Sequence, residues 1–166
     1  MKNIINAIFI LCLAVATSSC TESDKSKVIG VWKLKTRTTD IPFDVNNDGS
    51  FSTNLVDEID CNEIETLTFE ENGTVFSGNE ASVILKYFKT ADSNTYGLNV
   101  ECNKDGVISF ASSYNEIDEN TIQVSGRDYV ISNNEMTVVF EVAVKIYNED
   151  FSEIIETRDL TLVYTK

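Results

Sequence analysis

The chain has 166 residues, with 27 aspartates and glutamates against 13 lysines and arginines, and it contains no histidine. This length suits one domain of ordinary size that buries its own core. A formal net charge of −14 disfavours nucleic-acid binding, because that affinity is built from lysines and arginines that displace counterions from phosphates. Without histidine there is no Ser-His or Cys-His nucleophile pair, no imidazole base and no His-ligated zinc.

Residues 1–19 have the layout of a secretory signal peptide. Lys2 precedes an apolar stretch over residues 4–15, and small residues follow it up to Cys20. The apolar stretch is shorter than the roughly 20 residues that a membrane-spanning helix needs. We therefore expect a segment that is removed during export.

Cys20 directly follows Thr17-Ser18-Ser19 and resembles the lipidated first residue of a bacterial lipoprotein. The resemblance implies an acyl anchor on Cys20, a polar tether over residues 20–27 and a folded domain over residues 28–166. It also implies a location in the cell envelope, as an outer-membrane lipoprotein that faces the periplasm or the cell surface. The alternative is a secreted protein in which Cys20 has no special role.

The cysteine count agrees with an oxidising compartment. Cys12 leaves with the signal peptide and Cys20 takes the lipid, so that Cys61 and Cys102 remain as an even pair. Such a pair is expected to form a disulfide outside the cytoplasm, and two free buried thiols are the alternative. The chain has no Cys-x-x-Cys spacing, so the cysteines indicate neither a redox motif nor a metal site.

From Val28 onward the apolar residues alternate with a period of two, as in antiparallel strands that have one buried face. The clearest example is residues 136–146, where apolar side chains occupy every second position and Glu141 and Lys145 fall between them. Shorter runs with the same alternation contain Trp32/Leu34, Leu67/Phe69, Val83/Leu85/Tyr87, Tyr96/Leu98/Val100, Ile108/Phe110, Ile122/Val124 and Leu160/Leu162/Tyr164.

Turn residues rich in Asn and Gly separate these runs, at residues 71–73, 103–106 and 132–135. The count is about eight strands in up-and-down order, with no room for crossover helices. We predict an all-β fold, an eight-stranded antiparallel barrel, because closure removes exposed strand edges. A β-sandwich is the alternative. Gly126, where the alternation changes face, is expected to mark a bulge.

Gly30 and Trp32 form a Gly-x-Trp motif at the start of the first strand, and this motif resembles the lipocalin signature. The resemblance implies that Trp32 plugs the closed end of the barrel and that a basic residue packs on its ring. Up-and-down order would bring the end of the last strand beside Trp32, and the basic candidate there is Lys166. Together with the signal and the strand count, the chain resembles the lipocalin-like lipoproteins of Bacteroidota.

The one long insertion between the first two strands contains the spacing D-x-N-x-D-G. Asp44, Asn46 and Asp48 occupy positions one, three and five of an EF-hand-type calcium loop, and the carbonyl of Ser50 occupies position seven. Oxygen ligands at this spacing converge on Ca²⁺. Position twelve is Leu55, where such loops carry an acidic residue.

A short helix is expected over residues 54–60, with Asn54 as its cap. The resemblance to lipocalin-like lipoproteins implies that Glu58 completes the calcium shell from this helix, with Asp57 as a substitute. The alternative is a solvated loop that binds nothing.

The sequence shows no catalytic arrangement. Neighbouring acidic residues are expected by chance in a chain with 27 of them, so such pairs do not indicate an active site. We therefore expect that the protein is not an enzyme. A barrel can bind a small apolar ligand in its mouth. Alternatively, its own side chains fill it and its loops bind an envelope protein or a glycan. The side chains expected to point inward are Leu34, Phe69, Tyr87, Leu98, Phe110, Phe140 and Leu162.

Overall fold

The computed structural model describes residues 26–61, 64–78, 82–91, 95–103 and 109–166. The predicted signal peptide, Cys20 and most of the tether lie outside these residues. Within the described part of the chain, no helix has the length and apolarity that crossing a membrane requires.

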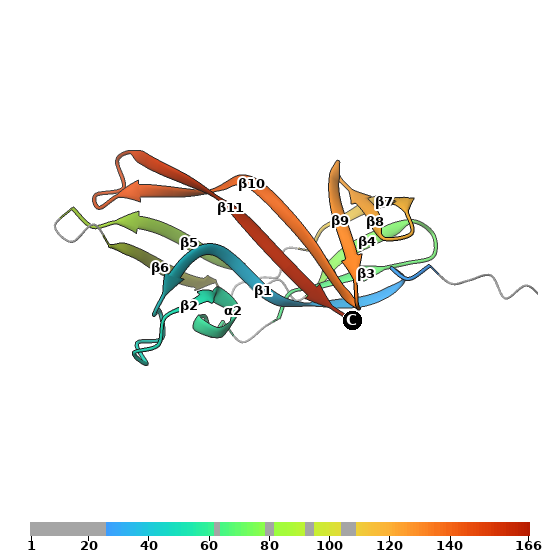
Figure 1. Ribbon diagram of the computed structural model, residues 1–166, viewed down its shortest axis with the longest axis horizontal. Helices are drawn as coiled ribbons and strands as arrows, with labels where there is room; N and C mark the ends of the chain where they lie inside the picture. The colour runs from blue at the N-terminus through green and yellow to red at the C-terminus, as the bar shows by residue number, and fades with distance from the viewer. Residues whose placement is uncertain (1–25, 62–63, 79–81, 92–94, 104–108) are drawn as a thin grey trace, which may run out of the picture.

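Eleven strands and one short helix make up the described chain (Figure 1). Their bounds are β1 Gly30–Phe43, β2 Ser52–Asn54, α2 Leu55–Glu58, β3 Thr66–Phe69, β4 Thr74–Gly78, β5 Ser82–Lys89, β6 Tyr96–Asn103, β7 Ala111–Asp118, β8 Thr121–Val124, β9 Arg127–Ser132, β10 Glu135–Asn148 and β11 Ile154–Thr165.

Eight of these strands close into an antiparallel barrel in the order β1-β3-β4-β7-β8-β9-β10-β11. β11 closes it, because it pairs with β10 on one side and with β1 on the other. The predicted fold class is confirmed: an all-β, up-and-down, eight-stranded barrel of the lipocalin-like kind, with the Asp44–Ser50 loop inserted after β1.

β5 and β6, which were expected in the barrel wall, lie outside it. β5 pairs in parallel with the far end of β10, where Tyr87 is opposite Ile146, and β6 pairs only with β5 in the sheet order. The wall instead contains β4, β7 and β9, which were not among the expected runs. β4 and β7 bury few apolar side chains, chiefly Val75 and Tyr114, so their alternation is weak in the sequence.

The long strands β1, β10 and β11 extend past the barrel and carry a second layer of structure (Figure 1). One apolar core lies inside the barrel, around Trp32, Phe69 and Tyr164. A second core lies between the extended ends of the long strands, the β5–β6 hairpin and α2, around Phe43 and Tyr87. The molecule therefore has two cores that share three strands.

Irregularities in β1 and β10 occur where these strands leave the barrel. The pairing of β1 with β11 shifts between Leu34 and Thr36. The pairing of β10 with β11 shifts between Phe140 and Val144, where Val142 has a φ of 55° and donates its N–H to Asp159. Such bulges bend a strand.

Gly126 does not form the expected bulge. With Ser125 it makes a two-residue turn between β8 and β9, and both residues have positive φ, 51° at Ser125 and 79° at Gly126. The change of face that the sequence shows is therefore a hairpin reversal.

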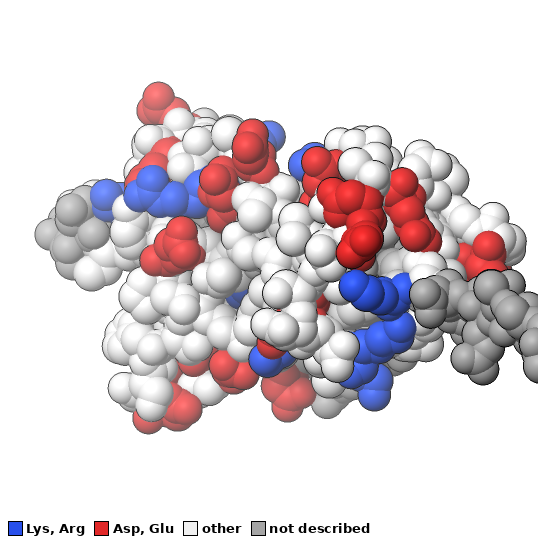
Figure 2. Space-filling model, turned by 45° about the vertical axis from the view of Figure 1, so that its right-hand side comes forward, with Lys and Arg blue, Asp and Glu red and all other residues white. Residues whose placement is uncertain are grey.

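Acidic side chains are scattered over both halves of the face shown in Figure 2, and basic side chains form smaller groups between them. With a net charge of −14, this surface is typical of a solvated exterior.

Candidate ligand site

One end of the barrel is closed by Trp32, whose side chain is 1% exposed and donates its Nε1–H to the carbonyl of Val28. Lys166 Nζ lies 5.4 Å from the centre of the Trp32 ring and donates to the carbonyl of Lys27. Gly30 leaves room for this lysine, because a Cβ there would be 3.2 Å from Lys166 Cε. Gly30, Trp32 and Lys166 thus meet at the barrel base.

The interior of the barrel is occupied by its own side chains. Phe69 is buried and meets Tyr114 edge-on, with the ring centres 5.1 Å apart. Leu34 and Leu162 belong to the same buried cluster, and Phe140 packs against it half-buried. Of these four predicted inward residues, Leu34, Phe69 and Leu162 form core and Phe140 packs against it.

The other three residues expected to point inward lie outside the barrel core. Tyr87 and Leu98 belong to the second core, because β5 and β6 pair outside the barrel. Phe110 precedes β7, and its side chain is 41% exposed. Its N–H donates to the hydroxyl of Ser77, and this bond fixes the backbone there and leaves the ring at the surface.

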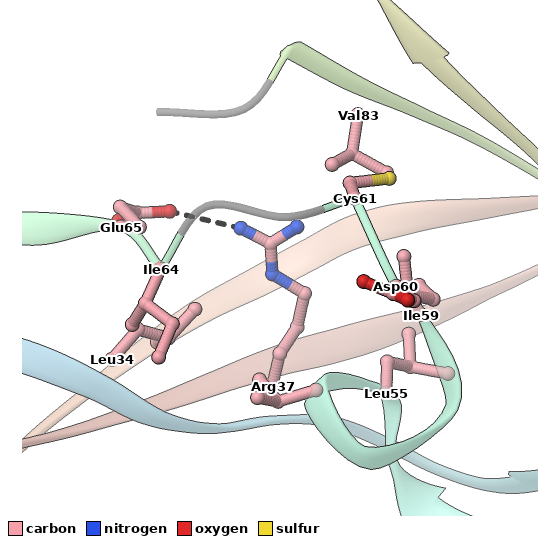
Figure 3. Close-up of a pocket in the computed structure, with 10 residues that line it drawn as sticks. Leu34, Arg37, Leu55, Ile59, Asp60, Cys61, Ile64, Glu65 and Val83 are labelled. Carbon is pink, nitrogen blue, oxygen red and sulfur yellow. Dashed lines mark hydrogen bonds and ion pairs between the residues drawn. The ribbon is translucent and has the colours of Figure 1, made fainter. Parts of the chain in front are cut away.

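A pocket of about 430 Å³ lies beside the barrel, next to Ile64 and Glu65, which precede β3 (Figure 3). Residues of β1, α2, the segment that follows α2 and β5 line it, and it is open to solvent on one side. Its apolar lining consists of Leu34, Leu55, Val56, Ile59, Ile64 and Val83. Its size falls in the range typical of small-molecule sites, about 300–1,000 Å³.

Arg37 rises from β1 into the middle of these lining side chains, with Glu65 on one side and Asp60 on the other (Figure 3). Its Nη2 donates to Glu65 Oε2 at 2.9 Å, and Glu65 Oε1 accepts a hydrogen bond from the Tyr164 hydroxyl. Arg37 Nε is buried without any hydrogen-bond partner. The pocket therefore contains an incompletely paired guanidinium.

Burial raises the pKa values of two tyrosines near this ion pair. Burial, followed by the charge of Glu65, raises the pKa of Tyr164 far above its usual range. Burial also raises the pKa of Tyr87 to about 12, although the charge of Arg37 opposes that rise. Both phenols stay protonated at neutral pH.

Asn54 positions α2 against β1 beside the pocket. Its side-chain oxygen accepts hydrogen bonds from the N–H of Arg37 and from the N–H of Val56, in the first turn of α2. The capping role of Asn54 was predicted, and the helix is shorter than expected, Leu55–Glu58.

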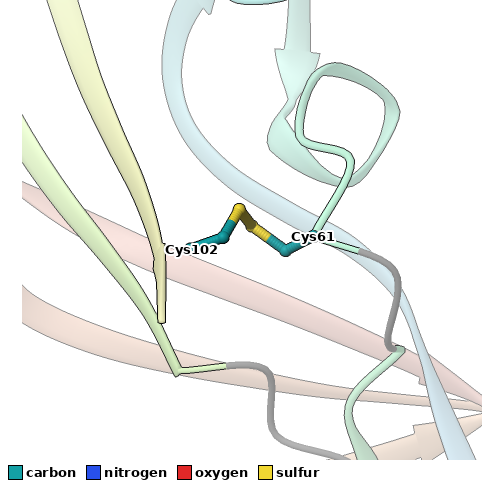
Figure 4. The surroundings of a disulfide bond; sticks show 2 residues. All are labelled: Cys61 and Cys102. Carbon is teal, nitrogen blue, oxygen red and sulfur yellow. A yellow bond between two sulfur atoms is a disulfide. The ribbon is translucent and has the colours of Figure 1, made fainter. Parts of the chain in front are cut away.

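A disulfide joins Cys61, in the pocket wall, to Cys102 in β6 (Figure 4). The Cα atoms are 5.6 Å apart, and the two residues are 41 positions apart in sequence. The predicted pairing is therefore present, and it ties the segment after α2 to the β5–β6 hairpin.

The Asp44–Ser50 loop is organised by hydrogen bonds from its own backbone. Both oxygens of Asp44 accept, from the N–H groups of Asp48 and Gly49, and Asp48 accepts from the N–H of Ser50. Asn46 Oδ1 also accepts from the N–H of Asp48. Such side-chain to backbone hydrogen bonds are typical of turns that Asp and Asn stabilise.

Glu58 reaches this loop from α2. Its side chain is buried, and Oε2 accepts the N–H of Val45 at 2.9 Å. Asp57 instead accepts a hydrogen bond from the side chain of Asn54. In the part of the chain that the structure describes, no three acidic, cysteine or histidine side chains converge closely enough to hold a metal ion.

Arg37 and Glu65 were not singled out from the sequence. If the alternation of Trp32 and Leu34 continued along β1, Arg37 would lie on the solvent face of the strand. The irregularity between Leu34 and Thr36 exchanges the two faces, so that Arg37 points into the pocket. The sequence offered no distinguishing signal, because β1 also carries the charged residues Lys33, Lys35 and Asp40.

No protein-family model, curated protein or solved structure matches the chain. The class of protein is therefore defined by geometry alone: a closed eight-stranded antiparallel barrel of lipocalin-like form, with an external pocket.

Proposed function

We propose that this chain is a cell-envelope lipoprotein that binds a small, mainly apolar molecule, and that it is a binding protein and not an enzyme. The observation that carries the proposal is the pocket of about 430 Å³ beside a barrel whose interior is already occupied. Six apolar side chains supply most of its lining, as in small-molecule sites generally.

The surroundings of the pocket favour a preformed site. The Cys61–Cys102 disulfide, the Arg37–Glu65 ion pair and the Asn54 cap each fix one wall relative to another. A site that is already ordered loses less entropy when a ligand binds.

Titration with N-phenyl-1-naphthylamine, a neutral fluorescent apolar probe, tests the proposal. Ile64 lines the pocket and is 55% exposed, so Ile64→Trp should fill the space without disturbing either core and should abolish most of the fluorescence gain. Ile117→Trp is the matched control, because Ile117 lies on β7 and is 57% exposed. Equal binding by both variants, or no binding by the unaltered protein, would refute the proposal that this pocket binds the ligand.

A second candidate function is an interaction module that binds an envelope protein or a glycan. The observation that favours it is the exposed apolar end of the β10–β11 hairpin, formed by Phe151, Ile154 and Ile155. A photo-crosslinker at Ile155 should then capture one defined partner in intact cells, and the same group at Ile117 should not. Native mass spectrometry of protein from cells would show a retained small molecule only under the first proposal.

The envelope location rests on the order of residues around Cys20. The presence of a disulfide supports it, since such bonds persist in oxidising compartments. Metabolic labelling with an alkynyl fatty acid should modify the protein, and Cys20→Ser should abolish the label. Cys12→Ser is the matched control and should keep it. The acyl chains would then provide the membrane contact.

We also propose a structural calcium ion in the Asp44–Ser50 loop. Asp44, Asn46, Asp48 and the Ser50 carbonyl would bind it, together with the Glu58 carboxylate. Support comes from the buried Glu58 side chain, which contacts the loop backbone at Val45. Because the acidic groups do not converge in the structure described, binding requires them to move together.

A further inference from the structure

We infer that the pocket takes an uncharged, mainly apolar molecule that presents one hydrogen-bond acceptor to the guanidinium of Arg37. An ester, ketone, amide or hydroxyl group would serve. This inference rests on the proposed function and names the chemical class of its ligand.

The acceptor is needed because Arg37 is only partly satisfied by the protein. A guanidinium carries five N–H donors. Only Nη2 donates to a side chain in the described structure, to Glu65, and Nε is buried without an acceptor. Because Nε is covered by the protein, a ligand oxygen would meet the outer nitrogens of the guanidinium, which line the pocket with a single side-chain partner in the described structure.

The charges in the pocket argue against an anionic ligand. Among its lining residues Arg37 carries one positive charge, and Glu65 and Asp60 carry one negative charge each, which leaves a sum of −1. Glu65 already occupies one edge of the guanidinium at 2.9 Å. A carboxylate or phosphate on the ligand would face two carboxylates in addition to its one partner, whereas a neutral acceptor is not repelled.

The remaining walls set the apolar character of the ligand. Leu55, Ile59 and Val83 lie around Arg37 on the side away from Glu65 (Figure 3). A molecule that places its acceptor near Arg37 would therefore extend its hydrocarbon part along these side chains, where burial of apolar surface is favourable.

Displacement of N-phenyl-1-naphthylamine by three molecules of equal chain length tests the inference. Methyl decanoate carries a neutral acceptor, decanoate carries a negative charge, and decane carries neither. We expect methyl decanoate to displace the probe at concentrations roughly tenfold lower than either of the others, the effect of one hydrogen bond to a charged donor.

Arg37→Met should remove the preference for the ester over the alkane, measured as the ratio of the two displacing concentrations within that variant. Arg37→Lys keeps a cation opposite Glu65 and is the variant to use if Arg37→Met does not fold. It should reduce the preference for the ester, because the planar set of guanidinium donors is lost. Arg127→Met is the control, since Arg127 stacks on Phe140 outside the pocket, and it should keep the full preference.

Each other outcome overturns the inference. Equal displacement by ester and alkane, or an ester preference that survives in both Arg37 variants, removes the role of Arg37. If decanoate is the strongest competitor, the pocket prefers an anionic ligand and the inference of a neutral one is wrong. If the probe binds and only this preference is absent, the proposed function stands without the inference, whereas absence of probe binding refutes both.

Discussion

At the scale of single residues, Glu65 connects the barrel core to the pocket. Its two carboxylate oxygens accept from different partners, Arg37 in the pocket and the buried Tyr164 hydroxyl. The side chain is 16% exposed, so each of these contacts forms away from bulk water. The position of Arg37 thus depends on a residue of the barrel core.

We predict that Tyr164→Phe lowers the free energy of unfolding by about 1.5–3 kcal/mol, the range for a hydrogen bond to a charged group. Urea denaturation measures this change. Tyr147→Phe is the control, because the Tyr147 hydroxyl has no hydrogen bond to the described residues, and it should have little effect. Equal stability of the two variants would show that the Glu65 contact contributes nothing.

The raised pKa of Tyr87 predicts a loss of stability at alkaline pH. The unfolded tyrosine ionises near its ordinary pKa of 10.0, while the folded residue stays protonated up to about 12. The contribution to stability is therefore complete below pH 10 and is lost as the pH rises toward 12, at about 1.4 kcal/mol per pH unit. Urea denaturation between pH 9 and about 11 should show this slope, and Tyr87→Phe should make it shallower. An unchanged slope in the variant contradicts the assignment.

At the scale of elements, the segment from the Asp44–Ser50 loop through α2 to Cys61 holds one wall of the pocket. It has one short strand, β2, and a helix of four residues. Local structure of this length is not stable alone. Its order therefore depends on the Asn54 cap, the disulfide and the proposed calcium ion.

For the calcium ion, we predict a higher melting temperature in millimolar calcium than in EDTA. Asp44→Asn should remove most of that difference, because it deletes a charged ligand. Asp150→Asn is the matched control, since Asp150 organises the turn between β10 and β11 in a similar way through Ser152. If calcium does not change the melting temperature of the unaltered protein, the loop does not bind the ion.

For the disulfide, we predict that the double variant Cys61→Ser, Cys102→Ser loses up to about 4 kcal/mol of stability, because the bond closes a loop of 41 residues. Cys61 lines the pocket, so the affinity for the apolar probe should fall as well. Thermal denaturation with and without reductant measures the first effect and probe titration measures the second. Tight probe binding by the variant would show that the disulfide does not shape the site.

At the scale of the whole molecule, the closed barrel follows from features that are local in the sequence. Closure was predicted from the number of alternating runs and the cost of exposed strand edges, and the meeting of Trp32 and Lys166 was implied by the resemblance carried by Gly30-x-Trp32. The external position of β5 was not predictable in this way, because its apolar alternation fits any partner strand. Its place depends on how far β10 extends past the barrel.

The candidate site was predicted only in part, and for a similar physical reason. The Cys61–Cys102 pairing follows from composition, and the cap at Asn54 follows from local chemistry. The role of Arg37 depends on one extra residue in β1, which exchanges the two faces of the strand. Alternation alone cannot reveal such a change.

The central claim is that the ligand binds beside the barrel and not inside it. A crystal structure with a brominated medium-chain ester, located by anomalous scattering from bromine, tests it most directly. We expect the bromine among the apolar side chains of the pocket, near Val83 or Ile59, with the ester oxygen at Arg37. A bromine inside the barrel beside Phe69, or at neither place, would contradict it.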